Sequence, residues 1–301
     1  MEYLVYRFFC FLGMHLPDWL SLFIGRAIAE LRYFFCPGLR KIITENVRQV
    51  LIYRQQTEKI DFDETVLKKT VKGAYRNFGI YMVEFFQIPK WNKERVKKQV
   101  QVVNIHYLDQ VLARSKGAIV LTGHLGNWEL AGVVTSLLGY NLSAIALPFR
   151  NERIAMIFVR RRKLMGVNVI LTGANPKEYL RAFRENSVIA ILGDRLFTEK
   201  GVCVKFMGKD TYLPRGPATL AVKWKAGYLA GFLIREKKGK YMLVFDKPME
   251  VPENQDQQKQ VQSLVQQGAR YLEKYILKYP EQWLNFSRMW DYKQEGFYDK
   301  N

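Results

Sequence analysis

A short apolar segment that runs into a histidine-containing turn constrains the fold of this chain more than any other feature. Residues 117–122, Gly-Ala-Ile-Val-Leu-Thr, have the apolar, β-branched character of a buried strand. Residues 130–138 are apolar and compatible with a helix. In an open α/β sheet, functional sites gather where a strand ends and a helix begins. The sequence therefore places its first candidate site in residues 123–129.

Two residues of this turn form a candidate general base. His124 and Glu129 are five positions apart, so a tight turn followed by the first helical turn would bring the carboxylate onto the imidazole. Gly123 and Gly126 flank the histidine and let a substrate approach the backbone. A neutral imidazole would remove a proton from a hydroxyl, and the carboxylate would stabilise the imidazolium. No serine or cysteine stands beside the pair, so we expect the hydroxyl to belong to the substrate. The alternative is a structural histidine, with a glutamate favoured by the helix dipole.

The complete string Gly-His-Leu-Gly-Asn-Trp-Glu-Leu at residues 123–130 resembles the signature of the lipid A biosynthesis late acyltransferases. These enzymes belong to the lysophospholipid acyltransferase superfamily, which is marked by a histidine, four residues and an acidic residue. The resemblance implies that a fatty acyl chain moves from an acyl carrier protein or acyl-CoA thioester to a hydroxyl of a lipid. It also implies a lysophospholipid acyltransferase-like fold.

Strands and helices alternate along the rest of the chain. Further apolar strands are expected at 143–147, 167–171 and 187–193, with helical segments between them, and 229–235 and 241–245 are expected to form a hairpin. Such alternation favours an α/β fold with a mainly parallel central sheet and flanking helices.

The resemblance adds a second carboxylate and a set of backbone donors to the site. An aspartate in the matching family segment is functional, and Asp194 holds that place here, directly after an expected strand. Whether Glu129 or Asp194 contacts the imidazole of His124 stays open. Backbone N–H groups around Gly123 and Gly126, or those of a neighbouring loop, would stabilise the oxyanion of the thioester adduct.

A polar segment between the two acidic positions matches the family as well. Asn151 and Arg160 fit its asparagine and arginine, and Arg161 fits if the alignment slips by one position. Arg160, with Arg161 or Arg195 as substitutes, would bind a phosphate of the acceptor or of the donor's phosphopantetheine, because a guanidinium bonds phosphate bidentately. A solvated helix face is the alternative for residues 160–163, and it is what we expect for Arg161 or Arg162.

The net charge and the cysteine content limit the classes of partner and of compartment that we expect. The 47 lysines and arginines exceed the 28 acidic residues by 19, so an acidic partner is expected: nucleic acid, an anionic membrane surface or an acidic carrier protein. No zinc-finger spacing or RNA-binding signature appears, which ranks nucleic acid low. The three cysteines are widely spaced, which indicates a reducing compartment. No metal cluster and no nucleotide-binding loop appears, so no metal or cofactor is expected.

The N-terminal segment is apolar and aromatic but interrupted by charges. We expect residues 1–36 to form a helical anchor that lies in a membrane interface, and residues 37–301 to form the acyltransferase domain. A single pass from Phe8 to Ile24 is an alternative, although it would bury Asp18 and Pro17. The other alternative is that the segment packs on the globular core. The expected location is the cytoplasmic face of a bacterial inner membrane.

The acceptor is the least constrained part of the hypothesis. Residues 279–284, Tyr-Pro-Glu-Gln-Trp-Leu, resemble the family's C-terminal signature, but Asn285, Ser287 and Met289 replace its usual tryptophan, histidine and arginine. A lipid A precursor is the leading acceptor, and another glycolipid such as a phosphatidylinositol mannoside, a lysophospholipid or an aminolipid is the alternative. Two readings from other classes are a non-catalytic lipid-binding membrane protein and a thioesterase-like hydrolase.

Overall fold

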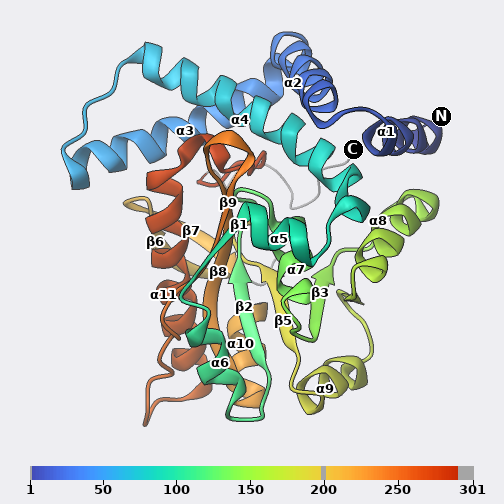
Figure 1. The fold of residues 1–301 in the computed structure, drawn as a ribbon. Helices are drawn as coiled ribbons and strands as arrows, with labels where there is room; N and C mark the ends of the chain where they lie inside the picture. Colours follow the sequence, from blue (N-terminus) through green and yellow to red (C-terminus); the bar gives the residue numbers. More distant parts are fainter. Residues whose placement is uncertain (1, 198–200, 291–301) are drawn as a thin grey trace.

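The computed structural model describes residues 2–197 and 201–290 of the chain. Within these residues, a seven-stranded sheet carries helices on both faces, and a group of N-terminal helices lies across one end of it (Figure 1). The α/β class and the mainly parallel sheet are therefore confirmed.

The sheet has the strand order β1-β9-β8-β2-β5-β3-β4, and its neighbours are parallel except for the β8–β9 hairpin. Strands β6 and β7 form a separate antiparallel pair. The strands are β1 (Val100–Val103), β2 (Ala118–Thr122), β3 (Leu142–Ala146), β4 (Val167–Leu171), β5 (Val188–Leu192), β6 (Gly201–Phe206), β7 (Lys209–Pro214), β8 (Gly227–Arg235) and β9 (Tyr241–Phe245).

The expected helices are present, and the longest of them, α4, spans 23 residues. The helices are α1 (Glu2–His15), α2 (Asp18–Phe35), α3 (Pro37–Glu58), α4 (Glu64–Phe86), α5 (Lys93–Gln99), α6 (His106–Leu112), α7 (Trp128–Leu137), α8 (Glu152–Leu164), α9 (Pro176–Arg184), α10 (Gly216–Trp224) and α11 (Gln257–Lys278), with 3₁₀ turns η1 (Ile88–Lys90), η2 (Lys237–Gly239) and η3 (Pro280–Gln282).

The central strands are apolar throughout because both of their faces are covered. Ile119 and Leu121 of β2 pack into the core under α10 and α11. Ala118 and Val120 of the same strand point to the opposite core, which includes residues of α7 and α8. Strands buried on both sides read as continuous hydrophobic runs, as residues 118–122 do.

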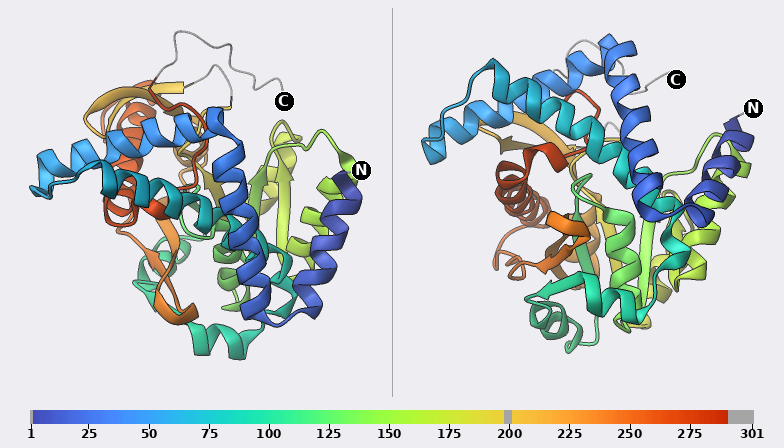
Figure 2. Two further views of the ribbon diagram at one scale, coloured as in Figure 1. Left: turned by 90° about the horizontal axis from the view of Figure 1, so that it is seen from above. Right: turned by 45° about the horizontal axis from the view of Figure 1, so that its top comes forward.

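The N-terminal segment forms two helices, α1 and α2, that pack on α4 (Figure 2). Their outer faces expose large apolar side chains, which include Phe8, Phe11, Trp19, Phe34 and Phe35. No helix in the described part of the chain has both the length and the apolar content that crossing a membrane requires. The single pass from residue 8 to residue 24 is not formed, because α1 ends before α2 begins.

Candidate active site

The ends of two parallel strands bring the main site residues together. Thr122 ends β2, Leu192 ends β5, and the two residues are paired in register. The chain therefore leaves both strands at the same edge of the sheet, where His124 meets Asp194 although 70 positions separate them. Gly123 permits this approach, because a β-carbon there would lie 3.2 Å from Cγ of Asp194.

Asp194 holds both the ring and the backbone of His124. Its Oδ1 lies 2.9 Å from the imidazole Nδ1, and its Oδ2 accepts the backbone N–H of His124 at 3.0 Å. The indole N–H of Trp283 also donates to Oδ2, at 2.9 Å. Asp194 is fully buried. Burial alone would raise the pKa of this carboxyl group, but the imidazole and the two N–H donors outweigh burial and hold the pKa below its usual value.

The contact of Nδ1 with Asp194 leaves the second ring nitrogen of His124, Nε2, as the candidate proton acceptor. When Nδ1–H donates to the carboxylate, Nε2 keeps its lone pair and can accept a proton. The ring of Trp128 meets the imidazole edge to face, with centroids 4.9 Å apart, and stacks at 4.1 Å on Tyr81. His124 lines a cavity together with both aromatic rings. The pair thus consists of a buried carboxylate and an imidazole that it orients at the wall of a cavity.

Glu129 does not take the place beside His124 that its spacing predicts. Its two oxygens accept hydrogen bonds from Nε and Nη2 of Arg162, at 2.8 and 2.5 Å, and both side chains are largely buried. Burial would lower the pKa of Arg162, but the Glu129 carboxylate outweighs this and raises it, so the guanidinium stays charged. Since α7 begins at Trp128, Glu129 lies on its first turn, where the helix points the carboxylate toward α8 and not back to the imidazole.

Two of the backbone N–H groups expected to form an oxyanion hole are already engaged. His124 N–H donates to Asp194, and Gly126 N–H donates to the carbonyl of Gln282 at 3.0 Å. Gly126 has φ +64°, and a β-carbon there would lie 2.0 Å from the carbonyl oxygen of Leu233. The two glycines therefore allow close packing of the turn against its neighbours, and the N–H groups of His124 and Gly126 are not free to bind an oxyanion.

The buried carboxylate of Glu84 holds the turn of residues 123–127 in place. Glu84, in α4, accepts hydrogen bonds from Nε and Nη2 of Arg235, at 2.8 and 2.6 Å, and from the hydroxyl of Tyr241 at 2.7 Å. Glu84 also accepts a hydrogen bond from Nδ2 of Asn127 at 2.6 Å. Oδ1 of Asn127 in turn accepts the N–H of Leu130 and so caps α7. One carboxylate thus ties α4 and the β8–β9 hairpin to the turn that carries His124.

The cavity in front of His124 has a volume of about 770 Å³. Its polar groups include His124, Glu129 and Arg162, and much of the remaining wall is apolar. The apolar lining includes Ile145, Leu147, Phe149, Phe158, Ile191 and Leu192. A few polar groups converging in a mainly apolar cavity are typical of a ligand site. The mainly apolar lining suits an alkyl chain.

The other residues expected to bind substrate take different places. Arg160 is exposed on α8 and does not line the cavity. Asn151 caps α8 by accepting the N–H groups of Arg153 and Ile154. The guanidinium of Arg195 lies 4.9 Å from the ring centroid of Phe197. Their substrate-binding roles stay predictions.

Three contributors to the site were not identified from the sequence: Arg162, Trp283 and Glu84. The expectation of a solvated face for Arg162 is wrong, because this side chain is buried against Glu129. Trp283 carries a signal that was available, since it lies in the segment 279–284 that resembles the family signature. Glu84 lies within α4, outside the motifs that resemble the family, and carries no such signal. Arg161 donates to the carbonyl of Phe86.

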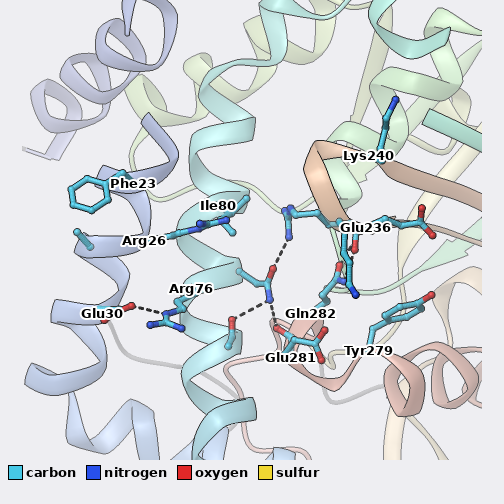
Figure 3. Close-up of a pocket in the computed structure, with 15 residues that line it drawn as sticks. Phe23, Arg26, Glu30, Arg76, Ile80, Glu236, Lys240, Tyr279, Glu281 and Gln282 are labelled. Atoms are coloured by element: carbon cyan, nitrogen blue, oxygen red, sulfur yellow. Dashed lines mark hydrogen bonds and ion pairs between the residues drawn. The ribbon is translucent and has the colours of Figure 1, made fainter. Parts of the chain in front are cut away.

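A larger cavity of about 1120 Å³ lies on a different face of α4 (Figure 3). Its lining includes Arg26 and Glu30 of α2, Arg76 of α4, and Arg235 beside Gln282. His124 does not line this cavity, and the carbonyl of Gln282 is the acceptor for the Gly126 N–H. It therefore borders the far side of the turn that carries His124.

Comparison with known proteins decides the family. The family model for bacterial lipid A biosynthesis acyltransferases matches residues 2–291. The chain belongs to this family. It is also similar to the phosphatidylinositol mannoside acyltransferase of Mycolicibacterium smegmatis, with 28% identity over 224 residues, 73% of this chain and 72% of that protein. The Mycobacterium tuberculosis protein of the same name is 31% identical over 163 residues, 52% of each chain. The protein is thus an acyltransferase, and the non-catalytic reading is set aside.

The three C-terminal residues that differ from the family pattern, Asn285, Ser287 and Met289, do not line the cavity that contains His124. Nδ2 of Asn285 donates to the backbone carbonyl of Asp194, and Met289 is buried. Backbone carbonyls of Asn285 and Ser287 accept hydrogen bonds from Asn46. None of the three lines the catalytic cavity in the described residues, so these departures bear on the support of Asp194 and carry little information about the acceptor.

Proposed function

We propose that this acyltransferase uses His124 as a general base to move a fatty acyl chain from a thioester to a hydroxyl of a membrane glycolipid. The observation that carries this proposal is the 2.9 Å contact of His124 Nδ1 with the buried Asp194, beside an apolar cavity. A positioned general base of this kind contributes roughly 10²–10⁴ to a rate.

The proposed reaction proceeds by direct attack of the acceptor. Nε2 of His124 takes the hydroxyl proton as the acceptor oxygen attacks the thioester carbonyl carbon, and Asp194 stabilises the imidazolium. The carbon–sulfur bond of the tetrahedral adduct then breaks. The imidazolium returns the proton to the departing thiolate, which leaves an ester and a free thiol. No covalent enzyme intermediate is needed.

Arg162 is our candidate for stabilising negative charge in this reaction. It lines the catalytic cavity and keeps a positive charge because Glu129 neutralises and orients it. A fixed cation in a largely apolar cavity stabilises a developing oxyanion or a phosphate group more than it would in water. In this proposal Glu129 acts through Arg162, and Asp194 is the carboxylate that acts through His124.

For the acceptor, two candidates each have a separate observation in their favour. The family description supports a lipid A precursor, which the sequence signature also favours. The names of the similar mycobacterial proteins support a mannoside of phosphatidylinositol. Both are anionic glycolipids with free hydroxyl groups, which agrees with a chain whose formal charge is +19.

We also propose that the enzyme works on the cytoplasmic face of a bacterial inner membrane, with α1 and α2 in the interface. Exposed aromatic side chains on these helices, such as Phe8, Trp19 and Phe35, support this placement. Leu147 and Phe149 line the catalytic cavity and are themselves partly exposed, so its mouth also has apolar surface.

The test is a thioester-release assay on the purified full chain. Acyl carrier protein and CoA carrying a fatty acyl chain are each supplied with a lipid A precursor, with phosphatidylinositol mannoside or with no acceptor. We expect thiol release that depends on one of the glycolipids, together with a new ester detected by mass spectrometry. Equal release without any acceptor would indicate a hydrolase and would overturn the proposal.

A further inference from the structure

The two N-terminal helices form a groove that the proposed reaction does not use. Both helices pack on α4, and Figure 2 shows that they diverge from the turn that joins them. Gly25 sets the contact of α2 with α4, since a β-carbon there would lie 2.9 Å from the carbonyl oxygen of Gly79. Gly13 sets the contact of α1, because a β-carbon there would lie 2.8 Å from Cβ of Phe86. Between these contacts a cavity of about 260 Å³ remains, which we call the N-terminal groove.

The walls of the N-terminal groove are mainly apolar and come from one stripe of each helix. They include Leu12 of α1, Ile24 and Ile28 of α2, and Phe78 and Met82 of α4. On α2, the lining positions run from residue 21 to residue 32, a length of about 16 Å along a helix. An apolar groove with this length and volume fits a single alkyl chain better than a compact ligand.

A cation stands at the end of the groove on α2. Arg32 is exposed, and its guanidinium carbon lies 5.8 Å from the ring centroid of Phe78. Within the described residues it has no ion pair, in contrast to Arg76, which bonds Glu30. Its charge also acts on the nearby hydroxyl of Tyr6, another groove residue. The groove therefore combines apolar walls with an unneutralised cation, which is the complement of an anionic amphiphile.

We propose that the N-terminal groove binds one acyl chain of an anionic phospholipid of the bilayer, with its phosphate at Arg32. This proposal rests on the membrane placement proposed above, because the outer faces of α1 and α2 are then in contact with lipid. Tyr6 connects the groove to the active site: its ring lies 6.2 Å from that of Phe158, which lines the catalytic cavity. A lipid held here steadies α1 against the wall of that cavity, separately from the acceptor and the acyl donor.

The experiment uses the full chain in vesicles that contain a phosphatidylglycerol or a phosphatidylcholine with a photoreactive group in one acyl chain. After irradiation, crosslinked peptides are identified by mass spectrometry. We expect labelling of α1, α2 and the 78–86 segment of α4, about fivefold stronger with phosphatidylglycerol, the effect of one cation on an anionic lipid. Met82→Trp fills the floor of the groove and should lower this labelling at least fivefold. Leu31→Trp, on an exposed position of α2, should not.

A second pair of variants tests the headgroup contact. Arg32→Gln should reduce the preference for phosphatidylglycerol to about one, whereas Arg26→Gln, on the same helix but in the larger cavity, should retain it. Equal labelling in Met82→Trp and Leu31→Trp would overturn the proposal, as would equal preference in both arginine variants. The thioester-release assay with detergent-dispersed acceptor is run on the same variants. It reports the proposed reaction separately, because groove variants should retain turnover while His124→Ala should retain lipid labelling.

Discussion

Asp194 contacts His124 through both of its carboxylate oxygens: Oδ1 lies 2.9 Å from the ring nitrogen Nδ1, and Oδ2 accepts the backbone N–H at 3.0 Å. The carboxylate therefore fixes both the tautomer and the position of the imidazole. Asp194→Asn keeps the shape but removes the charge, so kcat should fall by about 10³–10⁴, with much smaller changes in KM. Steady-state kinetics measure this. Asp210→Asn, an exposed aspartate, is the control and should retain full activity.

Trp283 should contribute a smaller share through the same carboxylate. Trp283→Phe keeps an aromatic ring but removes the N–H that donates to Asp194 Oδ2. A hydrogen bond to a charged group contributes about 1.5–3 kcal/mol, so we expect kcat to fall roughly tenfold or more. Trp290→Phe is the matched control, because the indole N–H of Trp290 donates to the backbone carbonyl of Phe206. If both variants had the same kcat, the role of Trp283 would be structural alone.

Variants of Arg162 and Arg160 distinguish the side of α8 that lines the cavity from its exposed side, because Arg162 lines the cavity and Arg160 is exposed. Arg162→Lys keeps a positive charge but loses the two-point contact with Glu129. We expect kcat/KM to fall by about 10–100-fold, the effect of disturbing charged hydrogen bonds. Arg160→Lys should change it little. The opposite ranking in acyl-transfer kinetics would return the phosphate-binding role to Arg160.

Glu84 should matter for stability more than for chemistry. Glu84→Gln leaves Arg235 without its buried counter-charge, and breaking a buried ion pair in this way costs about 3–5 kcal/mol. Urea unfolding followed by circular dichroism gives the free energy of unfolding. Glu64→Gln removes an exposed partner of Arg48 and should leave the midpoint unchanged. A small effect at position 84 would mean that water replaces the lost contact.

The lowered pKa of Asp194 also predicts how stability depends on pH. A carboxyl group whose pKa is lower in the folded state than in the unfolded state stabilises the fold above its unfolded pKa of about 3.9. That contribution is lost as the pH falls through the folded value, which is lower still. The difference in unfolding free energy between the wild type and Asp194→Asn should therefore shrink as the pH falls from 7 toward 3. A constant difference would show that the carboxylate is not stabilised by its neighbours.

Much of the fold follows from local patterns in the sequence. The buried strands at 118–122 and 188–192 are continuous apolar runs, and the helix after Asn127 begins with a capping residue, so segment type and order are readable. The position of His124 at a strand end follows directly from them.

The partner of that histidine could not be read in the same way. Local spacing favoured Glu129, whereas the strand order places β5 beside β2 and thereby brings in Asp194. Strand order depends on contacts between distant segments, which a single sequence does not display. The same limit applies to Glu84, because its partners Arg235 and Tyr241 are more than 150 positions away.

The most direct test of the central claim is the rate of acyl transfer to the lipid hydroxyl by His124→Ala, measured on vesicle-bound enzyme with the acceptor identified in the release assay. The account predicts a loss of about 10²–10⁴ in kcat with unchanged binding to vesicles. Transfer at the wild-type rate in this variant would contradict it.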